Sequence, residues 1–169
     1  MGKGTIRTAR AGEIGEILSI YAQAREFMEQ NGNPSQWGKS GYPERELLLY
    51  DIELERLFVL ERDGNTEAVF VLAEGDEPTY AEIEDGAWKN DKPYLTIHRL
   101  ASRTASHGCA EEVLEYCKKA AVENGKDLRA DTHEDNAPML HILKKNGFCY
   151  CGIISVRSGS KRRAYQMIT

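Results

Sequence analysis

The spacing of apolar residues predicts a strand and two helices in the first third of the chain. Apolar and polar residues alternate over 5–9, as expected for a strand. Apolar positions at helical spacing over 14–28 predict a helix that ends at Asn31-Gly32-Asn33-Pro34. A turn-rich connection leads to a second helix, which is expected from Pro43 to about Glu53.

The middle of the chain predicts a hairpin followed by an acidic loop. Two short apolar runs, 56–61 and 67–73, flank Asp63-Gly64, a residue pair typical of tight hairpin turns. Segment 75–92 is rich in loop residues and carboxylates. Two alternatives stay open for it: an exposed loop, or a flap that faces a substrate.

The remaining elements predict the fold class. They are a strand at 94–101, a helix at 107–124, a strand at 127–132, a helix at 136–146 and a hairpin of 148–156 with 163–168. The order βααβββαβαββ predicts an α/β (α+β) fold, with a mixed, mostly antiparallel central sheet of about seven strands flanked by about four helices. We expect a single domain spanning 1–169.

Composition narrows the classes of partner. The chain has 169 residues, 41% of them hydrophobic, which suits one globular domain. A net charge of −5 argues against nucleic-acid binding. We interpret the short basic cluster Lys161-Arg162-Arg163 as a solvated hairpin edge, with attraction of cofactor phosphates as the alternative. No apolar run has the length of a membrane span, so we expect no membrane partner and a cytoplasmic location.

The four cysteines do not indicate a metal or disulfide framework. Their positions, 109, 117, 149 and 151, match neither a zinc site nor a secreted scaffold, and we expect no metal. Cys149 and Cys151 lie two apart in a predicted strand, so we expect both to be small core residues on one face.

Two loops are candidates for the functional site, because ligands of such sheets favour the carboxyl ends of parallel strands. The first loop, 102–110, is small and polar and enters a strong helix at Gly108-Cys109-Ala110. Free N–H groups and the helix dipole suit a phosphate there, although ordinary capping is the alternative. The second loop, 133–136, leads to a helix that ends at Asn146-Gly147-Phe148. Helix capping alone does not readily explain the presence of both loops at this spacing.

These features resemble the GNAT superfamily of N-acetyltransferases, most closely from Ile97 to Gly152. The family's coenzyme loop reads Gln or Arg, two residues, Gly, one residue, then Gly or Ala. Gly108-Cys109-Ala110 matches its second half, whereas Ala105 replaces the Gln or Arg. An Asn that opens a helix before a terminal Gly-Phe is matched by Asn136 and Gly147-Phe148.

The resemblance implies direct transfer of an acetyl group from acetyl-CoA (coenzyme A) to a primary amine of a small-molecule acceptor. The pantetheine arm would lie between the splayed fourth and fifth strands, with the backbone of Leu100 facing the thioester oxygen. The pyrophosphate would lie on the amides of 105–110. The implied coenzyme-binding residues are Leu100, Ala101, Ser102, Ala105, Ser106, His107, Gly108, Cys109, Ala110 and Asn136.

The residues that would handle protons and the acceptor are less defined. Many family members carry a Tyr acid where this chain has Leu143, but a thiol with a pKa near 8.5 leaves tolerably well as a thiolate. The candidate general bases are His98, Glu82, Glu84 and His133. Aromatic residues that either wall an acceptor pocket or anchor loops are Trp37, Tyr42, Tyr80 and Trp88. The acidic stretch 76–85 hints at a cationic acceptor.

Two other classes of protein stay open. The missing Gln or Arg and the missing Tyr allow a non-catalytic acyl-CoA-binding sensor or interaction module on the same fold. A Cys/His metal or redox protein is the third class. The oligomeric state is open as well, with a homodimer among the options.

Overall fold

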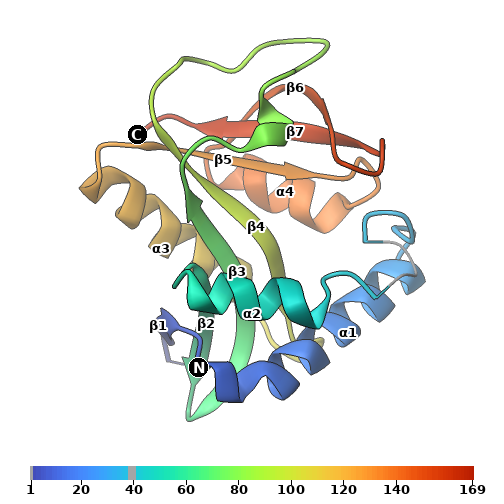
Figure 1. The fold of residues 1–169 in the computed structure, drawn as a ribbon, viewed down its shortest axis with the longest axis vertical. Coiled ribbons are helices and arrows are strands. Elements are labelled where there is room, and N and C mark those ends of the chain that lie inside the picture. Colours follow the sequence, from blue (N-terminus) through green and yellow to red (C-terminus); the bar gives the residue numbers. More distant parts are fainter. Residues whose placement is uncertain (1, 38–40) are drawn as a thin grey trace.

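Seven strands form one sheet in the computed structural model, which describes residues 2–37 and 41–169 (Figure 1). In sequence order they are β1 (Thr5–Thr8), β2 (Leu57–Arg62), β3 (Asn65–Glu74), β4 (Tyr94–Ser102), β5 (Asp127–Thr132), β6 (Cys149–Ser155) and β7 (Lys161–Met167). Their order across the sheet is β1-β2-β3-β4-β5-β7-β6. β4 and β5 pair in parallel, and the other neighbours pair antiparallel. The predicted mixed, mostly antiparallel sheet is confirmed.

Helices cover both faces of this sheet (Figure 1). They are α1 (Ile14–Gln30), α2 (Arg45–Glu53), α3 (Cys109–Glu123) and α4 (Ala137–Lys145). The structure also has two short turns of 3-10 helix that were not predicted, η1 (Ala11–Glu13) and η2 (Pro78–Tyr80). α1 and α2 bury their apolar stripes against β2, β3 and the end of β4. α3 and α4 pack on the opposite face against β3, β4 and β5. Burial of each large apolar side chain contributes roughly 1.5–3 kcal/mol.

Segment 75–92 is docked on the sheet, on the same side as α1 and α2 but over β5, β7 and β6. The Trp88 indole donates to the Tyr80 carbonyl, and the Arg129 guanidinium lies 4.1 Å from the Trp88 ring centroid. Glu84 forms a backbone bridge with Ile153 of β6. The segment therefore belongs to the covering layer of the fold, and its first half approaches the centre of the sheet.

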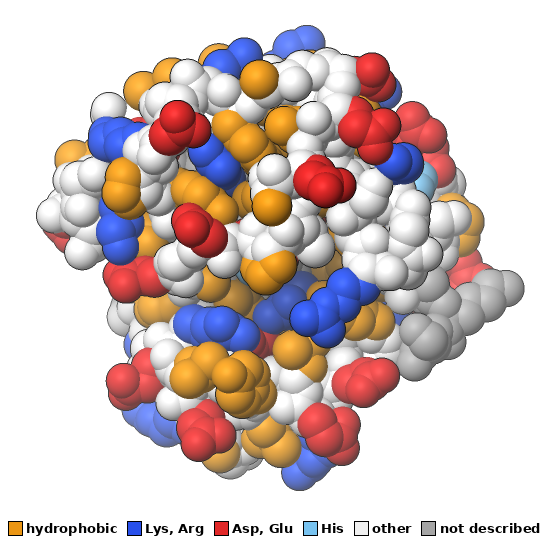
Figure 2. All heavy atoms as spheres, turned by 45° about the horizontal axis from the view of Figure 1, so that its top comes forward, with side chains coloured by type: hydrophobic (Ala, Val, Ile, Leu, Met, Phe, Trp, Pro, Cys, Tyr) orange, Lys and Arg blue, Asp and Glu red, His pale blue; other side chains and the backbone are white. Residues whose placement is uncertain are grey.

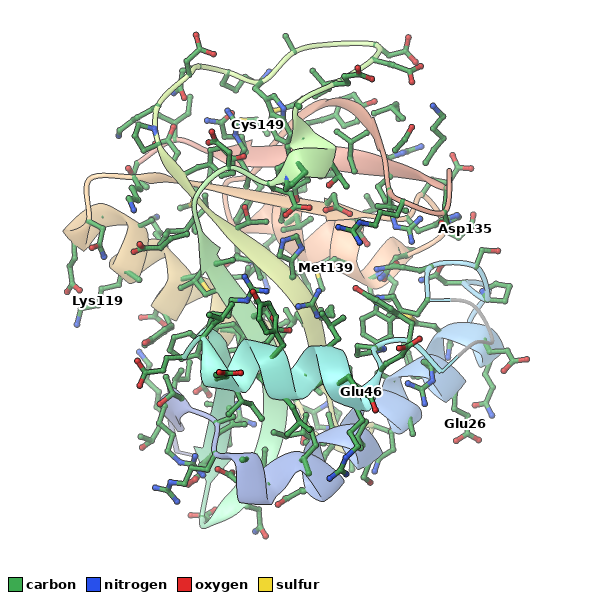
Figure 3. The ribbon with its side chains drawn as sticks, viewed as in Figure 1. Glu26, Glu46, Lys119, Asp135, Met139 and Cys149 are labelled. Carbon is green, nitrogen blue, oxygen red and sulfur yellow. The ribbon has the colours of Figure 1, made fainter. Side chains whose placement is uncertain are left out.

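Two expectations about side-chain burial are wrong. Cys149 is exposed while Cys151 is buried. The backbone bridge at Glu84 and the close approach of Gly86 cover β6 at 151–153. They do not cover Cys149, the first residue of β6, which Figure 3 labels. Arg162 is only 7% exposed, so the basic cluster is not a uniformly solvated edge. Alternation along β7 leaves Lys161 in solvent and turns Arg162 toward the centre of the molecule.

Within the described residues, no helix combines the length and the apolar character that a membrane crossing requires.

Asp127 fixes the start of β5. Its carboxylate is fully buried and accepts hydrogen bonds from the Thr169 amide, Asn90, Gln166 and Lys92. Burial alone would raise the pKa of this carboxyl group, but the hydrogen bonds outweigh it and lower the pKa to about 2. A carboxyl group whose pKa is lowered by folding stabilises the native state above its unfolded pKa, and this contribution disappears as pH falls through the folded pKa.

We therefore expect Asp127→Asn to lower the free energy of unfolding by a constant amount above about pH 5 and by progressively less between about pH 4 and pH 2. Urea unfolding of the parent and the variant across this range measures the difference. Asp91→Asn, at an exposed carboxylate nearby in sequence, is the control. A difference that stays constant down to pH 2 would contradict the role of Asp127.

Candidate functional site

A cleft opens where the parallel strands separate. β5 pairs with β4 only along Tyr94–Ile97, and beyond this point the two strands run apart in front of α4 (Figure 1). The cleft reaches both faces of the sheet, and Figure 3 shows Met139 of α4 at its centre. Its lining residues are Met28, Gln36, Trp37, Ile97, His98, Arg99, Leu100, Leu114, Ala130, Asp131, Thr132, Asn136, Met139 and Leu143.

A β-bulge shapes the β4 wall of this cleft. His98 is paired with Val71 of β3 and Ala101 with Val69, so two residues of β4 lie opposite one residue of β3. Arg99, in the bulge, has a φ of 49°, a conformation that non-glycine residues rarely adopt. One extra residue reverses the alternation of side chains. His98 and Arg99 therefore both face the side of α1 and α2, although they are consecutive.

The bulge also orients a peptide group. The Tyr21 hydroxyl of α1 donates to the Arg99 carbonyl at 2.7 Å. In a planar trans peptide the C=O and the following N–H point in opposite directions, so this bond turns the Leu100 N–H away from Tyr21. Arg99 and Leu100 have no paired residue in either neighbouring strand. Burial raises the pKa of Tyr21, so its hydroxyl stays protonated as a donor.

Two pairs of side chains, each with one carboxyl group, lie on the side of the cleft that segment 75–92 covers. Glu77 Oε2 lies 3.6 Å from His98 Nε2, and this interaction, opposed by burial, lowers the pKa of Glu77. Across the cleft, the Tyr80 hydroxyl donates to Asp131 at 2.6 Å. Burial raises the pKa of Asp131, although this hydrogen bond opposes the shift. The sequence analysis proposed His98 and Tyr80 but missed Glu77 and Asp131, because a lone acid in a loop or strand carries no local signal.

Arginines lie on the same face of the sheet, toward α2 and the loop before it. Arg99 pairs with the fully buried Asp51 of α2 and donates to the Tyr42 hydroxyl at 3.2 Å. Arg56 binds the other oxygen of Asp51 at 2.7 Å, and Arg162 donates to the Gln36 carbonyl. Figure 2 shows a band of basic side chains across the hollowed middle of one face. Of these arginines, the sequence analysis named only Arg162, as part of the basic cluster whose alternative role was attraction of cofactor phosphates.

The entrance of α3 is where the sequence predicts an anion site. Gly108 has a φ of 71° and no side chain caps the helix, and an added Cβ would find only ordinary contacts, at 3.8 Å from Arg62. Arg62 donates to the His107 carbonyl at 2.8 Å and thus holds the loop. Arg103, in the same loop, donates to the Thr66 carbonyl and to Glu16.

The predicted coenzyme residues fall in two groups. Leu100 and Asn136 line the cleft, and Asn136 caps α4 through the Met139 amide while donating to Gln36 at 2.9 Å. The others continue β4 or form the loop and first turn of α3: Ala101, Ser102, Ala105, Ser106, His107, Gly108, Cys109 and Ala110. Ser106 donates to Glu67, so this loop also carries a carboxylate.

Of the other predicted residues, Trp37 lines the cleft and the rest do not. Glu82 and Glu84 are exposed, and Glu84 pairs with Lys161 at 2.7 Å. His133 lies just beyond the Thr132 wall and accepts from the amide of Asp135, which Figure 3 labels at the edge of the molecule. Trp88 anchors segment 75–92. Trp37 lines the cleft and packs edge-on against Tyr21, with Tyr42 beside it.

No group of three or more His, Cys, Asp or Glu side chains is arranged for a metal ion in 2–37 and 41–169.

Solved structures identify the class of protein. No family model and no curated protein matches the sequence. A GNAT-family acetyltransferase from Streptococcus agalactiae is 33% identical, with 98% of this chain and 95% of that chain covered and a TM-score of 0.84. A GNAT-family acetyltransferase from Listeria monocytogenes has 16% identity, coverage of 98% and 97%, and a TM-score of 0.72. YncA from Salmonella typhimurium, solved with its cofactor acetyl-CoA, has 15% identity, coverage of 98% and 94%, and a TM-score of 0.66.

The splayed sheet and these similarities together define an acetyltransferase. The chain belongs to the GNAT family.

We predict that Tyr21→Phe lowers kcat for acetyl transfer roughly 10-fold, because loss of the hydroxyl lets the Arg99-Leu100 peptide turn. This loss is smaller than the roughly 100- to 1000-fold decrease in kcat that follows complete removal of an oxyanion donor. Steady-state kinetics measure kcat, and calorimetry measures the Kd of acetyl-CoA, which should change little. Tyr50→Phe, at an exposed tyrosine of α2, is the matched control. An unchanged kcat in Tyr21→Phe would contradict the proposed role of this hydrogen bond.

Proposed function

We propose that the chain transfers the acetyl group of acetyl-CoA directly to a primary amine of a small-molecule acceptor. The observation that carries this proposal is the unpaired Arg99-Leu100 peptide at the point where β4 and β5 separate. It supplies an N–H donor inside a cleft that reaches both faces of the sheet. One face offers the helix entrance at Gly108 for an anion, and the other offers His98.

The coenzyme would enter from the side of α3 and α4. The first amides of α3, with the helix dipole behind them, would bind the pyrophosphate. The pantetheine arm would pass between the strands beside Leu100 and Asn136, both of which line the cleft. Leu100 N–H would then stabilise the negative charge that develops on the thioester oxygen as the amine attacks.

The acceptor would approach from the side of α1, α2 and segment 75–92. An amine attacks only as the free base, so a proton must leave it. His98 lines this side, and Glu77 holds its imidazole from the covering segment. The lowered pKa of Glu77 keeps that carboxylate ionised at neutral pH.

Direct attack fits the lining of the cleft better than an acetyl-enzyme. Among the residues that the structure places around the cleft there is no cysteine, and Cys109 and Cys117 are buried in and under α3. Leu143 lines the cleft and is fully buried, in the place where many family members carry the Tyr acid. The thiolate would therefore leave without a proton from this position.

Gly108→Glu should abolish acetyl-CoA binding, because it places a carboxylate and a strained backbone where the pyrophosphate would lie. Calorimetry measures binding, and release of free thiol with a panel of amines measures transfer. Gly125→Glu is the matched control, since Gly125 has a φ of 63° at the far end of the same helix. Undiminished acetyl-CoA binding by Gly108→Glu would show that the coenzyme site is elsewhere. Binding without thiol release for any amine would favour the non-catalytic sensor.

Glu77→Gln should lower kcat/KM, because the imidazole of His98 loses the carboxylate that faces it at 3.6 Å. His98→Gln should remove the acid limb of the kcat/KM profile and lower kcat roughly 100-fold. Both are read from pH-rate profiles with one acceptor. Glu82→Gln, at an exposed carboxylate of the same segment, is the control. A limb that survives in His98→Gln would assign the base to another group.

A further inference from the structure

Four arginines converge on the acceptor side of the cleft, although the chain as a whole has a net charge of −5. They come from four parts of the fold: Arg25 from α1, Arg56 from the turn before β2, Arg99 from β4 and Arg162 from β7. Arg25 donates to the Tyr42 carbonyl at 3.1 Å, and Arg99 donates to the hydroxyl of the same residue.

The carboxylates around them do not balance this charge. Asp51 is fully buried and already binds both Arg99 and Arg56. Asp131 accepts from Tyr80, and Glu77 faces His98. Within the described residues, no carboxylate lies at ion-pair distance from Arg25 or Arg162. Arg162 is only 7% exposed, and Asp131 is the carboxylate whose charge acts on it from a longer distance.

A buried guanidinium that shares its counter-ion, as Arg99 does, or has it only at a longer distance, as Arg162 does, is costly, because its lost hydration is compensated only in part. An anionic group in the cleft would offset that cost. The arginine cluster therefore favours a negatively charged ligand on the acceptor side.

Arg99 is the member of this cluster that lines the cleft. Its backbone conformation, with φ at 49°, is one that the surrounding structure must stabilise. Without the bulge, Arg99 would point to the face of α3, away from His98. With it, a guanidinium and an imidazole stand side by side on one wall. An acceptor that meets both has an anionic group a few bonds from its amine.

We propose that the acceptor is an amino acid or a closely related amine, whose carboxylate is bound by Arg99 while its amine lies at His98. This inference rests on the proposed acetyl transfer in the same cleft. Asp51, with Arg56 on its other oxygen, positions Arg99. The planar guanidinium suits a carboxylate because it donates two parallel hydrogen bonds. A polyamine or an aminoglycoside would instead bring its positive charges to the arginines, and the acidic residues Glu82 and Glu84 lie too far out on the surface to compensate.

The test compares matched pairs of acceptors by thiol release from acetyl-CoA. Each of the common amino acids is assayed beside its carboxamide, which keeps the amine and the side chain but loses the negative charge, and a polyamine is included. The best amino acid should exceed its carboxamide in kcat/KM by at least roughly 10-fold. Arg99→Gln should lower kcat/KM for that amino acid roughly 10- to 100-fold, mainly through KM, and should change the carboxamide less than about 3-fold.

Two further variants separate recognition from structural damage. Arg45→Gln removes an exposed arginine of α2, outside the lining of the cleft, and should keep the preference for the carboxylate. Arg99→Lys keeps the charge without the planar fork and should recover part of the affinity. Thermal unfolding and acetyl-CoA binding of Arg99→Gln confirm that it folds. If it does not fold, Arg99→Lys carries the comparison.

Two results would overturn the inference while the proposed function stands: equal use of carboxamides or polyamines by the parent, or equal losses for both members of a pair in Arg99→Gln. If no amine of either kind releases thiol although acetyl-CoA binds, acetyl transfer to a small amine is itself contradicted, and the inference falls with it.

Discussion

One extra residue in β4, between its pairings with Val69 and Val71 of β3, shapes the whole cleft. The bulge ends the regular ladder on one side of β4 at the same height at which β5 leaves the other side. A peptide group without strand partners would be costly in a dry interior. Here the Tyr21 hydroxyl satisfies the Arg99 carbonyl, which directs the Leu100 N–H away from Tyr21. In the proposed function, a strand defect and one buried hydroxyl would thus prepare this N–H as a donor before any ligand binds.

The same bulge organises the charges around the cleft. It brings His98 and Arg99 to one face, where the two covering layers hold them from opposite sides: segment 75–92 through Glu77, and α2 through Asp51. The side of α3 is different, because it offers backbone amides and the loop held by Arg62. In the proposed function, the phosphates would therefore bind on one face of the sheet and the acceptor on the other, charged face.

The order and ends of the elements could be predicted because their signals are local. Periodicity places α3, and the Asp63-Gly64 turn places the β2/β3 hairpin. The roles of Tyr21 and Arg99 could not be predicted, because they depend on the register between β3 and β4, which no local pattern records. Arg162 was misjudged for a related reason: in a basic triplet, only the pairing of β7 shows which side chain is buried. The hint of a cationic acceptor came from counting acids in segment 75–92, whereas the fold turns Glu77, rather than Glu82 or Glu84, to the cleft.

The central claim, that the Leu100 N–H faces the thioester, can be tested by NMR of the amide-labelled protein. Acetyl-CoA should move the Leu100 amide proton downfield as a hydrogen bond to the thioester oxygen forms, and CoA, which lacks that oxygen, should not. The amides of 108–110 should shift equally with both ligands, since both carry the pyrophosphate. A Leu100 signal that responds identically to acetyl-CoA and CoA, or to neither, would contradict the account.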